Sequence, residues 1–257
     1  MTWADHLIHL NRFLETIQKS GLTLNLKKST FAKANTVFVG HVIGSGQIRP
    51  DPRKLQGIGD LQPPKTKKEV RSMIGFFSYF RAFIPLLAET ALPLTKLTQK
   101  DLPTKVQWGI EQQTAFENLK LKLMNAVTLH TINFKKEFGL SVDASGLAVG
   151  CCLFQWTEEG IECPVAFASA KLTATQTRWA TIEREAYGVV WALKRFRAWI
   201  FLAKVTIFSD HNPLTYLTEA ATKSAKLTWS LALQEFDIQF RYLPGKRNQV
   251  ADYLSRA

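Results

Sequence analysis

Residues 138–146 constrain the fold more than any other part of this sequence, because they combine a strand pattern with a charged end. Phe138, Leu140 and Val142 alternate with smaller residues, which is the period of a strand with one buried face. Asp143 closes that run and small residues follow, so a backbone or a ligand can approach its carboxylate closely. An aspartate at such a place is also common in ordinary turns. Asp143 is therefore either a functional carboxylate or a turn former, and the rest of the sequence is needed to distinguish these interpretations.

The composition indicates a globular protein with a polyanionic partner. The chain has 257 residues, of which 46% are hydrophobic, and a formal net charge of +12. The hydrophobic share argues against disorder, and the basic surplus favours nucleic acid. An anionic membrane surface is an alternative, but we find no isolated basic amphipathic stretch and no apolar run of membrane-spanning length. A basic surface without a specific partner is a third interpretation.

The cysteines favour a reducing compartment. The chain has three of them, Cys151, Cys152 and Cys163, and their spacing does not match a metal site. Adjacent cysteines do not readily bridge each other. We therefore expect buried free thiols.

The N-terminal part is expected to mix a helix with short strands. Apolar spacing predicts a helix over residues 5–20 and strands over 22–25 and 36–43. The prolines within 48–52 predict an extended segment. We expect His41, the one histidine on its strand, to be structural rather than a ligand.

A second helix is predicted after Pro63 and Pro64, with Thr66 and Glu69 as a capping box. Its expected buried stripe consists of Val70, Met73, Ile74, Phe77 and Phe80. Basic residues interleaved with aromatics and a glycine suit contact with a sugar-phosphate backbone. The candidate nucleic-acid-binding residues are Lys67, Lys68, Arg71, Gly75 and Tyr79. A solvated helix face is the alternative interpretation of this segment.

The main domain boundary is expected near residue 100, and the remaining elements predict a mixed α/β layer. The expected strands cover 137–143, 147–155, 162–168, 204–210 and 236–243, the first three as an antiparallel meander. The expected helices cover 111–124, 177–202, 213–218, 225–234 and 248–256.

Four carboxylates, including Asp143, lie at strand ends or beside apolar helix residues, where a metal site is possible. On the long helix, Glu185 lies about 70° from the centre of the apolar stripe and Glu183 about 90°. Glu185 therefore sits at the edge of the buried face, where it needs a cation or a proton, whereas Glu183 is more easily solvated. Asp210 ends an apolar strand as Asp143 does, and Asp252 lies in a short helix beside apolar neighbours.

These carboxylates can converge if the strands that end at Asp143 and Asp210 are neighbours and the long helix packs on them. Clustered carboxylates repel one another, and divalent cations relieve that repulsion. Ligation by oxygen alone selects Mg²⁺ or Mn²⁺. Two such ions serve in-line displacement at phosphorus, one activating water and the other stabilising the leaving 3′-oxygen.

Five motifs together resemble, in order and spacing, the ribonuclease H domain of Ty3/Gypsy-type retrotransposon reverse transcriptases. They are Val142–Ser145, Thr181–Ala186, Val190–Leu193, Ser209–Leu214 and Pro244–Arg256. The resemblance implies a ribonuclease H-like mixed sheet flanked by helices. It also implies a metal-binding and catalytic set of Asp143, Glu185, Asp210 and Asp252 that holds two Mg²⁺ ions, with Mn²⁺ as the other option.

The resemblance extends towards the N-terminus. Phe38–His41 and Gly46–Pro52 resemble the end of a reverse transcriptase palm with its primer-grip hairpin, and residues 65–97 resemble the thumb. This implies a palm remnant over 1–62, a thumb-like segment over 63–100 and a ribonuclease H-like domain over 101–257. By the same resemblance Arg71, Gly75 and Tyr79 lie along a duplex minor groove.

The resemblance implies a metal-dependent endonuclease that cuts the RNA strand of RNA–DNA hybrids. Its expected partners are such a hybrid or another duplex, and an upstream polymerase domain of a polyprotein, with no membrane. The sequence has no Tyr-x-Asp-Asp motif, so we do not expect polymerisation by this chain alone. We expect an intracellular location, in the cytoplasm, a virus-like particle or the nucleus. The alternative is a catalytically inactive or co-opted nucleic-acid-binding fragment, with exposed apolar surface at residues 7–17 and 36–43.

Overall fold

The computed structural model describes residues 2–209 and 233–242. The chain forms two compact units, Met1–Thr36 and Val37–Ala257. The first unit holds α1 (Trp3–Lys19) and a short 3-10 helix (Leu26–Lys28). The helix expected here is confirmed, but the strand expected over 22–25 is wrong. That segment is mostly exposed and pairs with no strand among the described residues.

The helix α1 is amphipathic but buries no side chain. Its large apolar side chains are exposed, namely Trp3, Leu7, Ile8, Phe13 and Leu14. The exposed apolar surface expected over residues 7–17 is therefore confirmed.

A small sheet follows, with the strand order β1-β2-β3-β4. Its strands are β1 (Asn35–Phe38), β2 (His41–Gly44), β3 (Gln47–Pro50) and β4 (Leu129–His130). The single strand expected over 36–43 is wrong, because Val39 and Gly40 adopt φ angles of 44° and 69° and reverse the chain between β1 and β2. Val37, Phe38 and Val39 are exposed, as expected for this surface, whereas residues 41–43 are half-buried.

A group of helices comes next. They are α2 (Pro52–Leu55), α3 (Lys67–Tyr79), α4 (Leu87–Thr90), α5 (Leu92–Lys96) and α6 (Ile110–Met124). The start of α3 is confirmed, because the Thr66 hydroxyl accepts from the Glu69 N–H at 3.3 Å. The Glu69 carboxylate accepts from the Lys65 N–H at 2.7 Å, so this cap reaches one residue further back than expected. Helices α3 to α6 share one core with fully buried Val70, Phe77, Leu94, Phe116 and Leu119.

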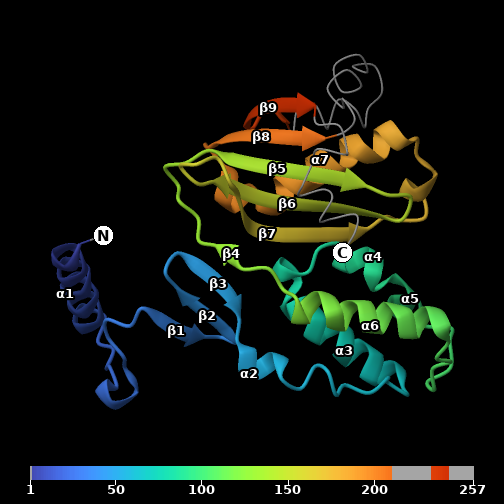
Figure 1. Cartoon of the computed structure of the whole chain (residues 1–257), viewed down its shortest axis with the longest axis horizontal. Coiled ribbons are helices and arrows are strands. Elements are labelled where there is room, and N and C mark those ends of the chain that lie inside the picture. The colour runs from blue at the N-terminus through green and yellow to red at the C-terminus, as the bar shows by residue number, and fades with distance from the viewer. Residues whose placement is uncertain (1, 210–232, 243–257) are drawn as a thin grey trace. The chain divides into compact units, whose positions relative to one another are not determined.

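The large sheet has five strands in the order β7-β6-β5-β8-β9 (Figure 1). They are β5 (Phe138–Ala144), β6 (Ala148–Trp156), β7 (Glu162–Lys171), β8 (Lys204–Ser209) and β9 (Asp237–Tyr242). The first three strands pair antiparallel, whereas β8 lies parallel to both β5 and β9. The expected mixed sheet and its meander are confirmed.

The long helix α7 (Thr181–Ile200) packs on one face of this sheet, and α4 contacts its edge strand β7 (Figure 1). Cys151 belongs to the core under α7 and Cys152 to the core shared with α3 to α6, because successive strand residues point to opposite faces. The division into segments 1–62, 63–100 and 101–257 stays a prediction.

The cysteines are all free thiols. Burial raises the pKa of the Cys151 and Cys152 thiols, as expected for buried cysteines. Cys163 is only half-buried, because it lies near the start of the edge strand β7, so the expectation of burial was wrong for this residue.

Several expected elements fall outside the described residues. These are the helices over 213–218 and 248–256 and all but the end of the helix over 225–234. Within the described residues, no helix is both long enough and apolar enough to cross a membrane.

Candidate active site

The site is built around the end of β5, the central strand of the large sheet. Asp143 is half-buried and stands one residue before that end. The chain then turns at Ser145, whose hydroxyl oxygen accepts from the backbone N–H groups of Leu147 at 3.2 Å and Ala148 at 3.0 Å. This turn ends β5 just after Asp143 and leads the chain into the antiparallel strand β6.

The neighbouring strand shows which face Asp143 occupies. Asp143 pairs with Gly150 on β6, and directly paired residues share a face. A Cβ on Gly150 would lie 2.4 Å from Cδ2 of Leu86, so this leucine packs directly on the glycine. Asp143 therefore lies on the face that the segment around α4 covers.

Helix α7 brings Glu185 to the same end of β5. A Cβ on Gly188 would lie 3.1 Å from Cγ1 of Val142 and 3.8 Å from Cβ of Ala144, the two residues that flank Asp143. Glu185 lies three positions earlier, on the same side of the helix, and is only 2% exposed. The glycine at position 188 thus permits the close approach that carries a buried carboxylate to the strand end.

A contact between Arg184 and the turn after β5 also places the first turn of α7 at this strand end. A Cβ on Gly146, in the turn after β5, would lie 3.3 Å from Nη1 of Arg184. The neighbouring Glu183 is half-buried, and its carboxylate accepts from the Ala180 N–H at 3.2 Å. Glu183 therefore caps the helix, and the expected order of burial, with Glu185 deeper, is confirmed.

Strand β8, which leads to Asp210, lies beside β5 as expected. Strand β8 lies parallel to β5, with Phe208 in register with Ser141, so both strands run to the same edge. Asp210 follows Ser209 in the sequence, and both Asp210 and Asp252 lie outside the described residues.

The described carboxylates fit part of a divalent metal site. No cluster of three or more His, Cys, Asp or Glu residues suited to a metal occurs in the described part of the chain. Asp143 and the buried Glu185 are nevertheless two oxygen donors brought to one end of the sheet by different elements. Such donors suit a hard divalent ion.

A cavity of about 640 Å³ opens beside Asp143 and Ser145, and its other walls come from the segment containing α4, α5 and α6. Lys122 of α6 reaches into it and donates to Oγ1 of Thr90 at 3.1 Å and to the Pro85 carbonyl at 3.3 Å. Burial lowers the pKa of Lys122, and nearby Glu89 opposes that shift. Sequence reasoning missed Lys122, although its place beside the inward residues Leu119 and Leu123 was a usable signal.

The structure gives two of the predicted nucleic-acid-binding residues an internal contact. Nζ of Lys67 donates to the carbonyls of Gln99 at 2.6 Å and Lys100 at 3.2 Å. Nη2 of Arg71 donates to the Thr98 carbonyl at 3.2 Å. Both side chains therefore tie α3 to the chain that follows α5, and their binding role stays a prediction.

The other predicted binding residues are open to solvent. Lys68 and Gly75 are exposed, and nothing lies within 4 Å of a Cβ built on Gly75. Tyr79 is partly exposed, and its hydroxyl donates to the Val39 carbonyl. Their role in binding also stays a prediction.

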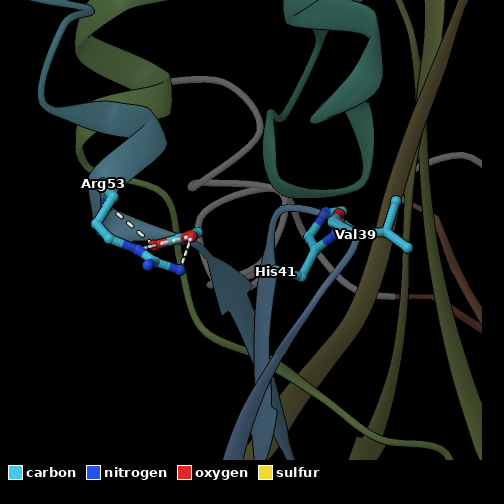
Figure 2. Close-up of polar contacts among 4 residues, drawn as sticks. Val39, His41 and Arg53 are labelled. Atoms are coloured by element: carbon cyan, nitrogen blue, oxygen red, sulfur yellow. Dashed lines mark hydrogen bonds and ion pairs between the residues drawn. The ribbon is translucent and has the colours of Figure 1, made fainter. Parts of the chain in front are cut away.

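The turn at Val39 is held from two sides. In addition to the tyrosine, Nδ1 of His41 lies 2.7 Å from the Val39 carbonyl oxygen (Figure 2). The His41 ring stacks on Phe83, with 5.4 Å between ring centroids. The structural role expected for His41 is confirmed, since these contacts join the hairpin to the end of α3 and to the short 3-10 helix (Arg81–Phe83) after it.

A second contact anchors the start of α2. Nη2 of Arg53 lies 2.8 Å from Oδ2 of Asp51, and the Arg53 N–H also donates to this carboxylate (Figure 2). The guanidinium lowers the pKa of Asp51.

Comparison with known proteins shows what the sequence of this chain is similar to. The family described as an RNase H-like domain found in reverse transcriptase matches residues 133–236. The chain is 34% identical, over 99% of its length, to a retrovirus-related Pol polyprotein from transposon opus of Drosophila melanogaster. It is 30% identical, over 98% of its length, to the transposon Tf2-3 polyprotein of Schizosaccharomyces pombe. It spans 26% and 19% of the lengths of these two relatives.

Solved structures share the fold. One is a foamy viral protease-reverse transcriptase in complex with RNA/DNA hybrid, with a TM-score of 0.79 and 22% identity, covering 96% of this chain and 34% of that one. Another is the same kind of protein in complex with dsDNA, with a TM-score of 0.77 and 22% identity, covering 94% of this chain and 52% of that one. At this identity the likeness concerns the fold.

Proposed function

We propose that this chain, which carries an RNase H-like domain of reverse transcriptase and has Pol polyproteins of Ty3/Gypsy-type retrotransposons as its homologues, is a divalent-metal-dependent endonuclease. It hydrolyses the RNA strand of RNA–DNA hybrids and leaves 3′-hydroxyl and 5′-phosphate ends. The observation that carries the proposal is that Asp143 and the buried Glu185 come to one end of a mixed sheet.

The proposed metal ligands are Asp143 and Glu185, joined by Asp210 and Asp252 on the strength of the family resemblance. Carboxylate oxygens favour Mg²⁺, with Mn²⁺ as a substitute. When bound, a pair of such ions supplies an activated water and stabilises the leaving oxygen.

The chain's own residues would prepare this site. Packing of Gly188 against β5 holds α7, and with it Glu185, in one position relative to Asp143, which removes the need to order the carboxylates during the reaction. The charge of Lys122 in the adjoining cavity favours an approaching phosphate. We expect the hybrid to be recognised by its backbone shape and 2′-hydroxyl groups rather than by base sequence.

We further propose that the chain acts within a longer Pol polyprotein, with polymerase motifs upstream, inside the cell. The transposon relatives support this proposal, because the chain aligns with about a quarter or less of their length.

The test compares Asp143→Asn with Asp237→Asn. Asp237 is an exposed aspartate at the opposite end of the same sheet, so the two substitutions remove the same charge from one sheet. The proposal requires that Asp143→Asn abolish cleavage of a labelled RNA–DNA hybrid while its melting temperature stays near that of the wild type, and that Asp237→Asn keep the activity. An unchanged rate in Asp143→Asn rules the mechanism out. Hybrid binding by the wild type without any cleavage supports a binding module instead.

A further inference from the structure

A second cavity, of about 570 Å³, lies between the helices around α4 and the edge of the large sheet. Residues of α3, α4, α5, β7 and α7 line it. The charged side chains among them are Arg81, Lys171 and Arg195, and no carboxylate lines the cavity among the described residues. The cavity beside Asp143 has the opposite character, because Glu89 and Glu111 share it with that aspartate.

The three cations are available to a ligand. Each residue is exposed, and among the described residues none of the three side chains has a hydrogen bond or an ion pair with a carboxylate. Other basic side chains of the same region are engaged, as Lys67 and Arg71 bind carbonyl oxygens. Three like charges around one concavity repel each other and concentrate a positive potential there, which an anion relieves.

The remaining lining supplies hydrogen-bond donors. The hydroxyl oxygen of Ser169 accepts from the Ala88 N–H at 2.9 Å, which leaves the hydroxyl hydrogen to be donated elsewhere. Ser78 and Thr95 add further hydroxyl groups to the lining. Guanidinium and hydroxyl donors around a positive cavity match the several acceptor oxygens of a phosphate group.

We propose that this cavity binds a phosphate group, carried by a nucleic-acid strand. The phosphate chemistry follows from the cavity alone, whereas the strand as its carrier rests on the proposed function. The location supports that carrier, because Arg81 follows α3, which holds the predicted duplex-binding residues, and Lys171 ends β7 of the nuclease-like sheet. The cavity thus lies where the helical segment meets the sheet.

The test uses two triple variants of equal net charge. The cavity variant is Arg81→Gln, Lys171→Gln and Arg195→Gln. The control variant is Lys96→Gln, Lys135→Gln and Lys194→Gln, three exposed lysines that do not line the cavity. Binding of a fluorescent RNA–DNA hybrid is measured by anisotropy in chelator, where no metal-dependent cleavage occurs, over a series of salt concentrations.

We expect the cavity variant to bind the hybrid roughly tenfold more weakly than the control variant. Its slope of log affinity against log salt should become shallower by about one unit for each phosphate that the cavity no longer neutralises. A charge-retaining variant, Arg81→Lys with Lys171→Arg and Arg195→Lys, should bind close to the wild type and shows that the cavity tolerates substitution.

A second arm separates the strand from free phosphate. The melting temperature is measured with added inorganic phosphate at constant ionic strength, for the wild type and both triple variants. Stabilisation that only the cavity variant loses, with hybrid binding unchanged, supports a site for free phosphate and refutes the strand as carrier. Equal behaviour of the two triple variants in both arms overturns the proposal. Salt-dependent binding of hybrid that is never cleaved with metal refutes the proposed function alone.

Discussion

The substitution Gly75→Ala should change the stability of the fold and the affinity for nucleic acid in opposite directions. Gly75 is exposed within α3, and a Cβ at this position would have nothing within 4 Å. Glycine inside a helix costs about 1 kcal/mol relative to alanine, so Gly75→Ala should stabilise the fold by that amount. In a chain of this size the melting temperature should rise by about 2–4 °C. Internal packing therefore gives no reason for a glycine here.

An external contact does give such a reason. If Gly75 lies against the backbone of a bound duplex, the added methyl group intrudes into a fitted contact. Overpacking of this kind costs about 1–3 kcal/mol, which corresponds to roughly 5- to 150-fold weaker binding. The same substitution should thus raise stability and lower affinity.

Thermal unfolding and anisotropy with a labelled RNA–DNA hybrid in chelator measure the two effects separately. Ser72→Ala is the control, because Ser72 is also exposed on α3 but is not a predicted contact, and alanine again favours the helix. The control should melt no lower than the wild type and bind with the same affinity. A higher melting temperature for Gly75→Ala with unchanged affinity refutes the contact, and a lower melting temperature refutes the reasoning from helix propensity.

Three further substitutions test contacts that stabilise the fold. Glu183→Ala should lower the free energy of unfolding by about 1 kcal/mol in urea titration, because the helix loses its cap, yet leave cleavage intact. Gly139→Ala should destabilise by about 1–3 kcal/mol, since its Cβ would lie 2.3 Å from ring atoms of the buried Phe154; an unchanged urea midpoint contradicts this. Arg53 lowers the pKa of Asp51 in the folded state, so this pair stabilises the fold above the unfolded pKa and loses its effect as the pH falls. The melting temperature of Asp51→Asn should therefore lie below that of the wild type at pH 7, and the gap should close below about pH 4.

The regular elements of the nuclease-like part were predictable because their signals are local. Alternating apolar residues placed β5, β6 and β8, and the apolar stripe of α7 was visible at helical spacing. The hairpin turn at Val39 was missed because the local pattern there indicates a strand. A β-branched residue inside an apolar run indicates a strand, whereas Val39 adopts a positive φ and its carbonyl is contacted by the distant Tyr79 and by His41.

The positions of Asp143 and Glu185 were more predictable than their surroundings. The strand end identified Asp143 and the helical wheel identified Glu185, since both depend on one element each. Lys122 and Leu86 were missed because their place depends on how α4 and α6 pack against the sheet, which no local pattern encodes. The internal contacts of Lys67 likewise became visible only once α3 and α5 were placed together.

The central claim is that the buried end of β5 is a metal-dependent nuclease site for RNA–DNA hybrids. The most direct measurement is cleavage of a hybrid labelled on each strand in turn, with Mg²⁺, with Mn²⁺ and with chelator. We predict cuts in the RNA strand only, with either metal, and none with chelator. Cleavage that persists in chelator, or that extends to the DNA strand, would contradict this claim.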